Sequence, residues 1–501
     1  MNPLEGILFG FSVCFQPINL FAVLLGALVG TLIGVLPGIG PVGTIALLLP
    51  ITLKMKPETG IILLAGIYYG SMYGGSTTSI LVNVPGEAAS VVTTLDGYQM
   101  AKKGRAGAAL AVAAVGSFVA GTLGVIGLMF FAPTLATFAL RFGSPEFFTI
   151  ALVGLLVLSR LSGGSLWPNL MVMSFGLALA TVGMDTVSSF PRFTMGIYEL
   201  TQGIELIAVI MGLYGISEVL FVAERAGGLP RVTSVRLKEM FPTAAEWRRA
   251  WPAIFRGSGI GFLWGLIPGP SPILSAFTAY NVEKRISKHP DEFGRGAIEG
   301  VAGPESANNA ATEGAMVPML SLGIPFTAGT ALLLAGLMIQ GIQPGPLLIA
   351  ERPEVFWGIV ASLYIGNAAL LILNLPLVGL WVSLLRIPQS VLVALILLLT
   401  LLGTYSINNS ILDLVVLSVM GIAGYIFRKI DLDLSPLVLA LVLGPMLETT
   451  FRQSLYTSRG NPSIFFQSPI CIGMWLIFLA FLILPVLRRR KKTRSQRPAS
   501  P

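Results

Sequence analysis

Residues 30–41 read Gly30-Thr-Leu-Ile-Gly34-Val-Leu-Pro37-Gly38-Ile-Gly40-Pro41, and residues 261–272 read Gly261-Phe-Leu-Trp-Gly265-Leu-Ile-Pro268-Gly269-Pro-Ser271-Pro272. The two stretches lie 231 positions apart and share six of their twelve residues. Glycine at every fourth position leaves a flat helix face that another backbone can approach closely. The Pro-Gly pair then stops the helix, because proline lacks an amide donor and glycine accepts unusual dihedral angles. The repeat therefore predicts two helices that break at corresponding positions, 37–41 and 268–272.

The composition places these breaks in a lipid bilayer. The chain has 501 residues, 54% of them hydrophobic and only 11% charged, with a mean hydropathy of +0.81. A soluble globular protein carries about 25% charged residues. We therefore expect an all-α polytopic membrane protein with roughly 10–12 transmembrane helices and two internal repeats that contain broken or re-entrant helices. The short apolar runs 42–53, 315–324 and 328–339 are predicted to be half-helices or re-entrant segments.

Clusters of Lys and Arg predict the organisation and orientation. We expect a first membrane repeat at 1–224, a cytoplasmic basic loop at 225–251, a second repeat with the C-terminal helices at 252–487, and a basic cytoplasmic tail at 488–501. Lys102, Lys103 and Arg105 are expected on the same side as the loop. The net charge of +8 is concentrated in loops and at the C-terminus. This pattern indicates contact with the anionic cytoplasmic leaflet rather than with nucleic acid.

The residue inventory argues against several functions. Cys14, Cys471 and His289 are the only cysteines and histidine, and none lies in a ligand-like spacing, so we expect no metal centre and no enzyme. An ion channel should show rings of charge or filter loops around an oligomer axis. A two-fold repeat within one chain is more typical of a secondary transporter. A channel, a permease for other solutes and, last, an intramembrane enzyme remain as alternatives.

Each predicted break is followed by a polar segment, at 69–86 and at 303–325. Small residues there expose backbone groups, and neither segment contains Lys or Arg. A carboxylate would have to bind at half-helix N-termini, to backbone N–H groups and hydroxyls. The candidate substrate- and ion-binding residues are Gly38, Gly40, Ser71, Ser76, Thr77, Thr78, Asn83, Gly269, Ser271, Glu305, Ser306, Asn308 and Asn309. The predicted helix-break prolines are Pro37, Pro41, Pro85, Pro268, Pro272 and Pro325.

Ionisable residues at membrane depth are expensive and therefore functional candidates, which singles out Glu305 and Glu313. Unwound carbonyls and the oxygens of Asn and Glu suit Na⁺ or H⁺ as the coupling ion. A Na⁺ site, if Na⁺ is that ion, is expected near Asn308 and Asn309. No other cofactor is expected. Glu87 and Asp96 stand close to the Lys102 cluster and are expected at the membrane interface.

Four motifs carry a resemblance to a known family. They are the 30–41 repeat, the 69–85 stretch, Leu95-Asp-Gly-Tyr-Gln-Met-Ala-Lys-Lys-Gly104, and Gly303-Pro-Glu-Ser-Ala-Asn-Asn-Ala310 with Leu322-Gly-Ile-Pro325. Together they resemble the large membrane subunit of tripartite tricarboxylate transporters, the TctA family, over essentially the whole chain. The family's functional segments correspond here to Gly34, Pro37, Gly38, Ser71, Ser76, Thr77, Thr78, Asn83, Pro268, Gly269, Glu305, Ser306, Asn308 and Asn309.

The resemblance implies symport of citrate-like or other carboxylates across the bacterial inner membrane, driven by an ion gradient. It also implies two partners, a small four-helix membrane subunit and a periplasmic solute-binding protein. Phe326 stands where a second glycine is usual in the family, and Glu313 where a small residue is usual. Because either residue can reshape the pocket, the identity of the carboxylate stays open, as do the coupling ion, the oligomeric state and whether the repeats are inverted.

Overall fold

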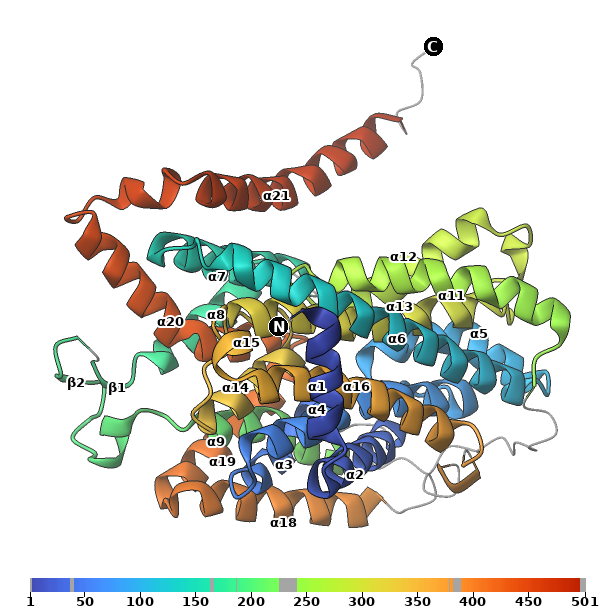
Figure 1. Cartoon of the computed structure of the whole chain (residues 1–501), viewed down its shortest axis with the longest axis horizontal. Coiled ribbons are helices and arrows are strands. Elements are labelled where there is room, and N and C mark those ends of the chain that lie inside the picture. The colour runs from blue at the N-terminus through green and yellow to red at the C-terminus, as the bar shows by residue number, and fades with distance from the viewer. Residues whose placement is uncertain are drawn as a thin grey trace. The chain divides into compact units, whose positions relative to one another are not determined.

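The computed structural model describes residues 2–36, 40–162, 166–185, 187–224, 241–377, 379–381 and 389–495. Pro37 and Gly38, most of the basic loop (225–240) and the end of the tail (496–501) lie outside the described residues. Six described helices are long and apolar enough to cross a membrane, by length and composition, and six further apolar helices are shorter. The chain is an all-α polytopic membrane protein, as its composition predicts (Figure 1).

The chain forms two compact units. Unit 1 comprises Met1–Leu140 and Ile204–Lys429. Its elements are α1 (Pro3–Cys14), α2 (Pro17–Val35), α3 (Gly40–Thr52), α4 (Pro57–Val82), η1 (Ala88–Ser90), α5 (Val91–Lys102), α6 (Ala106–Ala139), α9 (Leu206–Ile210), the π-helical η3 (Met211–Ile216), α10 (Ser217–Glu224), α11 (Ala244–Gly265), α12 (Ser271–Ile286), η5 (Pro290–Glu292), α13 (Glu299–Leu322), α14 (Ala328–Ile339), α15 (Leu348–Glu351), α16 (Pro353–Asn374), α18 (Gln389–Asn408) and α19 (Ile411–Lys429).

Unit 2 comprises Arg141–Gly203 and Ile430–Pro501. Its elements are α7 (Ser144–Leu161), α8 (Leu166–Ala180), β1 (Gly183–Met184), β2 (Pro191–Arg192), η2 (Glu199–Gln202), α20 (Ser435–Thr457), η6 (Pro462–Phe466) and α21 (Pro469–Ser495). Strands β1 and β2 pair antiparallel, with Gly183 opposite Arg192. Both copies of the Pro-Gly motif fall in unit 1, so the predicted repeats, 1–224 and 252–487, do not coincide with the compact units. Those repeat boundaries stay a prediction.

Two helix pairs in unit 1 share one packing geometry. Helix α2 packs along α4, and α11 packs along α13 (Figure 1). A Cβ added at Gly30 would stand 2.5 Å from the carbonyl oxygen of Ile67, and one added at Gly261 would stand 2.1 Å from that of Ala307. Gly30 and Gly261 are equivalent at the offset of 231, and Ile67 and Ala307 are equivalent at an offset of 240. The sequence repeat is therefore a structural repeat, in which the glycine face brings two backbones into direct contact.

The second helix of each pair ends in the same way. Asn83 after α4 and Gly323 after α13 both adopt the left-handed conformation, with φ of 58° and 71°. Glu87 and Thr327 then cap the next helical segment through their side chains. Pro85 and Pro325 lie between these points, within the two breaks. Each break frees backbone groups at the end of a buried helix, where an internal partner or a ligand has to satisfy them.

The first helix of each pair also stops where the repeat predicts. Helix α2 ends at Val35 and α3 begins at Gly40, while α11 ends at Gly265 and α12 begins at Ser271. The backbone N–H of Gly269, at φ of 149°, donates a 3.1 Å hydrogen bond to the carbonyl of Phe326. The break between α11 and α12 is therefore in contact with the break between α13 and α14.

Two predictions about local structure are wrong. Pro41 and Pro272 are the second residues of α3 and α12, so they start helices rather than break them. The proline ring presets the helical φ, and no donor is needed in the first turn.

The predicted half-helix at 315–324 is instead the end of the 24-residue α13, and the polar segments are helical through most of their length. Ser71 and Ser79 donate to carbonyls of their own helix, at 2.7 and 3.0 Å, which lets polar residues stay helical away from water.

Candidate functional site

One face of α13 carries five polar residues, Glu305, Asn308, Asn309, Thr312 and Glu313. Residues three and four apart share a helix face, so this spacing aligns them over two turns. Each of the five is at most 1% exposed. Helix α13 packs against α4, α5 and α6 in addition to α11 and α12, and these neighbours cover its polar face.

Glu305 joins three helices through its two carboxylate oxygens. The hydroxyl of Ser76 on α4 donates to Oε2 at 2.5 Å, and the hydroxyl of Thr93 on α5 donates to Oε1. Hydrogen bonds to a carboxylate are stronger than those between neutral groups. Both donors are neutral, and no ion pair to Glu305 occurs among the described residues. The buried charge is thus hydrogen-bonded but not neutralised, which suits a site for a cation or a proton.

Glu87 lies beside this carboxylate and was missed by the sequence reasoning. Expected at the interface, it is only 8% exposed and accepts a 2.9 Å hydrogen bond from the side-chain amide of Asn308. Its second oxygen accepts from the backbone N–H of Ala89 at 2.9 Å. A Cβ at Gly75 would lie 2.7 Å from Cγ of Glu87, so glycine on α4 makes room for the side chain. The chain reverses after α4, and this reversal turns Glu87 inward.

Asn309 links the same face of α13 to α6. Its amide nitrogen donates to Ser117 Oγ at 2.7 Å and to the backbone carbonyl of Glu305 at 2.9 Å. The amide oxygens of Asn308 and Asn309 and the hydroxyl of Ser306 are buried and have no hydrogen-bond partner in the described part of the chain. Buried polar atoms are normally paired, so unpaired acceptors point to an absent ligand or ion.

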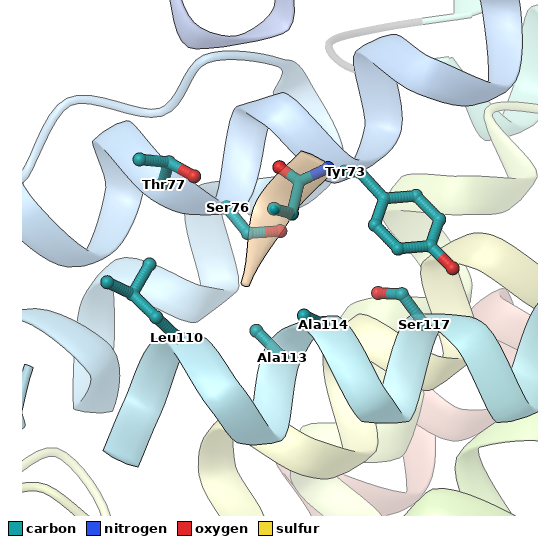
Figure 2. Close-up of a pocket in the computed structure, with 8 residues that line it drawn as sticks. Tyr73, Ser76, Thr77, Leu110, Ala113, Ala114 and Ser117 are labelled. Carbon is teal, nitrogen blue, oxygen red and sulfur yellow. The ribbon is translucent and has the colours of Figure 1, made fainter. Parts of the chain in front are cut away.

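A small pocket opens between α4, α6 and α16 next to these residues. Figure 2 shows Ser76 and Thr77 on α4 facing Ala113, Ala114 and Ser117 on α6. Tyr73, Leu110 and Asn374 complete the lining, in which the polar groups are all uncharged. Ser76 connects the pocket to Glu305, and Ser117 connects it to Asn309. The pocket therefore forms one candidate site with Glu305, Asn308 and Asn309 of α13.

The start of α12 reaches α13 from another side. Ser271, the first residue of the helix, is fully buried, and no described residue forms a hydrogen bond with its hydroxyl. One turn further on, Ser275 donates to the carbonyl of Ala307 at 3.1 Å. A helix N-terminus presents free backbone N–H groups and a partial positive charge. The predicted Ser271 is thus placed where a carboxylate oxygen can be bound without a cationic side chain.

The remaining predicted residues are placed differently. Thr78 donates to the carbonyl of Gly75 at 3.1 Å within its own helix, as Ser71 does within its helix. Asn83 is exposed at the end of α4, and nothing lies within 4 Å of a Cβ added at Gly40. The structure brings Ser76, Glu305, Asn308 and Asn309 together. It adds Glu87, Thr93 and Ser117. In the sequence, these three residues stand out only as polar residues in largely apolar segments.

The donor set fits a monovalent hard cation. Carboxylate, amide and hydroxyl oxygens are the ligands that such ions take in transporters. Within the described ranges, no group of three or more His, Cys, Asp or Glu side chains is placed to hold a metal ion. The residues that would hold Na⁺ are those with unpaired oxygens, Asn308 and Asn309, together with Glu87 and Glu305.

Paired helix breaks around a buried polar site define the chain as a membrane transporter. It belongs to the tripartite tricarboxylate transporter TctA family, whose model matches residues 20–439. The resemblance seen in the sequence is thereby confirmed. Two relatives from Agrobacterium vitis are similar to this chain. One, described as an uncharacterized 52.8 kDa protein in the TAR-I ttuC' 3'region, is 44% identical over 491 residues, which is 97% of each chain.

The second relative is described as an uncharacterized protein in the TAR-II ttuC' 3'region. It is 46% identical over 234 residues, which cover 46% of this chain and 97% of the relative. No solved structure matches this chain.

Proposed function

We propose that this chain is the substrate-translocating subunit of an ion-gradient-driven secondary transporter that imports an organic di- or tricarboxylate. In this proposal it acts in the bacterial inner membrane with a small four-helix membrane subunit and a periplasmic solute-binding protein. It catalyses no chemical reaction, and its only cofactor is the coupling ion, Na⁺ or H⁺. Family membership supports the substrate class and the tripartite assembly.

One observation carries the proposal: the buried polar site joins the two structural repeats. Ser76 and Glu87 come from α4 and the break that follows it, whereas Glu305 and Asn308 come from the equivalent helix α13. A site shared by two repeats opens to one side or the other when the repeats move relative to each other. Such motion is the basis of alternating access. A surface site on one repeat alone would not change the side to which it opens when the repeats move.

The chemistry of the site supports a carboxylate that travels with a cation. Glu87 and Glu305 would repel an anion unless a proton or Na⁺ neutralises them first. The hydroxyls along the pocket and the N-terminus of α12 are neutral donors for carboxylate oxygens. Binding of the anion would then depend on prior binding of the cation, which is how symport couples two solutes.

Basic residues support the predicted orientation of unit 1. Arg105 pairs with Glu246, and the ammonium of Lys103 donates to the carbonyl of Arg295 at 2.7 Å. Arg249 pairs with Glu299 at 2.8 Å. The basic segments around 103, 249 and 295 therefore lie together, and we propose that this end of unit 1 is cytoplasmic. The basic C-terminal tail is proposed to be cytoplasmic as well, which a C-terminal reporter fusion would test.

Counterflow tests the function. The chain is co-expressed with its small membrane subunit, reconstituted into liposomes preloaded with one unlabelled carboxylate, and supplied with the binding protein and labelled substrate. A panel of di- and tricarboxylates under equal ion concentrations identifies the substrate, and Na⁺ or pH gradients then identify the ion. We expect saturable counterflow for at least one carboxylate, and its loss in Glu305→Gln and Asn308→Ala.

The controls are exposed residues of the same unit. Asn281→Ala removes an amide that donates only to the carbonyl of Phe277 on its own helix, and Glu292→Gln removes an exposed carboxylate. Both variants should transport normally. Flux without counterflow would indicate a channel, counterflow of other solutes only would indicate a different permease, and product formation without a membrane gradient would indicate an enzyme. Any of these results would replace the proposal.

A further inference from the structure

Glu313 is a buried carboxyl group of α13 that the candidate site does not use. It is 0% exposed, and neither of its oxygens has a hydrogen-bond partner among the residues that the structure describes. By contrast, both oxygens of Glu305 and both of Glu87 accept hydrogen bonds. A carboxyl group left without partners in this way is exceptional in a folded protein.

The Glu313 side chain lies against the backbone of α6. A Cβ added at Gly124 on α6 would lie 2.7 Å from Cβ of Glu313, so the α6 backbone closes over it. The tyrosines of α4 and Tyr364 of α16 are close enough to interact electrostatically with its charge. Tyr69 nevertheless donates its hydroxyl proton to Asn367 Oδ1 at 3.0 Å, and Tyr73 donates to the same oxygen. These hydroxyls are therefore committed elsewhere.

Within the part of the chain that the structure describes, no ion pair compensates a charge at Glu313. Helices α6 and α14, which pack against α13, contain no ionisable residue. On the other packed elements, several ionisable side chains are directed to partners of their own: Arg249 to Glu292 and Glu299, Arg256 to Glu283, Tyr280 to Asp96, and Glu87 to Asn308. Among the described residues, the titratable groups within electrostatic range of Glu313 are Tyr68, Tyr69, Tyr73 and Tyr364.

An ionised carboxylate in these surroundings would cost several kcal/mol, because no hydrogen-bond donor and no cation of the described residues replaces its hydration. A carboxylic acid avoids that cost. The energetically consistent form of Glu313 in this arrangement is thus the neutral, protonated one.

Its position connects this acid to the candidate site. Glu305, Asn309 and Glu313 are four residues apart in succession, so they form one line along α13. At 1.5 Å per residue, the two carboxyl groups originate about 12 Å apart along the helix axis. A movement of α13 that exposes one of them to water therefore displaces the other as well.

We propose that Glu313 is the proton-binding site of the transporter, a carboxylic acid when buried and a carboxylate when the conformational change admits water. This inference rests on the proposed function and selects H⁺ as a coupling ion. On release, the O–H bond of the acid breaks, water accepts the proton as hydronium, and the carboxylate remains. On the opposite side of the membrane the reaction runs in reverse, and the neutral acid is buried again.

Two modes of transport separate proton movement from solute movement. Counterflow at equal pH needs no net proton transfer, whereas accumulation driven by an inward pH gradient does. We expect Glu313→Gln, which is neutral and nearly isosteric with the acid, to keep counterflow within about twofold and to lose pH-driven accumulation by about tenfold or more. Glu292→Gln should keep both modes, and Glu305→Gln should lose both.

A spectroscopic measurement adds a readout besides transport. The infrared C=O stretch of a protonated carboxylic acid should be present in the wild-type complex at neutral pH and diminished in Glu313→Gln. The inference is overturned if Glu313→Gln accumulates substrate like wild type, if it loses counterflow in parallel, if that band is unaltered, or if wild type ignores the pH gradient. Absence of carboxylate counterflow in wild type would instead overturn the proposed function itself.

Discussion

Asn308 donates a 2.9 Å hydrogen bond to Glu87 and so joins α13 of the second repeat to the helix break of the first. The bond is fully buried, and Glu87 at the same time caps η1 by accepting from Ala89. The local structure of one break therefore depends on a side chain of the other repeat. Any relative movement of the repeats has to break this bond or to carry η1 along with α13.

Replacing Asn308 by Ala should disable the site and destabilise the protein. The substitution leaves an oxygen of Glu87 buried without its donor, which costs about 1–3 kcal/mol. Asn308→Asp should be at least as harmful, because it replaces the amide donor with a carboxylate oxygen that faces the accepting oxygen of Glu87. Thermal unfolding in detergent and counterflow measure the two effects, with Asn281→Ala as the control. Wild-type counterflow in Asn308→Ala would remove this residue from the site.

Two glycines of α11 should respond in opposite directions. A Cβ at Gly261 would lie 2.1 Å from the Ala307 carbonyl oxygen, whereas nothing lies within 4 Å of a Cβ at Gly259. Gly261→Ala must push α11 away from α13 and should cost about 1–3 kcal/mol or more. Gly259→Ala should be neutral or should stabilise by about 0.5–1 kcal/mol through helix propensity. Yield of monodisperse protein and thermal midpoints measure both, and equal behaviour would refute the close contact.

Asp96 is predicted to anchor the segment between α12 and α13. Its side chain is fully buried, and one of its oxygens accepts from the backbone N–H groups of Gly294, Gly296 and Ala297 at 2.6–2.9 Å. Its other oxygen accepts from the Tyr280 hydroxyl at 2.9 Å. Asp96→Asn should destabilise by about 1.5–3 kcal/mol and Tyr280→Phe by about 1 kcal/mol. In limited proteolysis, cleavage within residues 287–297 should be fastest in Asp96→Asn, slower in Tyr280→Phe and slowest in wild type.

Acid should weaken the β1–β2 hairpin of unit 2. The backbone N–H of Val187, together with the Arg452 guanidinium, holds the pKa of Asp185 well below its usual range. Because this folded-state pKa lies below the unfolded value of about 3.9, the carboxylate stabilises the fold above that value and loses its effect as the pH falls through the folded pKa. The thermal midpoints of wild type and Asp185→Asn should therefore differ most at neutral pH, and the difference should start to shrink below about pH 4 and keep shrinking as the pH falls toward the folded pKa. A constant difference would contradict the assignment.

Much of the architecture could be predicted because it follows from local sequence. Hydropathy over about 20 residues decides whether a helix can span a bilayer. The spacing Gly26, Gly30, Gly34 predicts a helix face for close packing, and its recurrence at Gly257, Gly261 and Gly265 predicts the second pair. Proline and glycine end helices through their own backbone chemistry, so the interruptions after Val35 and Gly265 were visible in the sequence as well.

The composition of the site was decided by the tertiary structure. Glu87 reads as an interfacial residue beside a basic cluster, and only the reversal after α4 brings it to Asn308. Thr93 and Ser117 lie on helices whose faces could be assigned only once α5 and α6 were packed against α13. Helix formation depends on neighbours within four residues, whereas the burial of a carboxylate depends on groups more than two hundred positions away. The sequence by itself therefore determined the class of protein and its repeated, broken helices, and the packing of those helices determined which polar atoms meet.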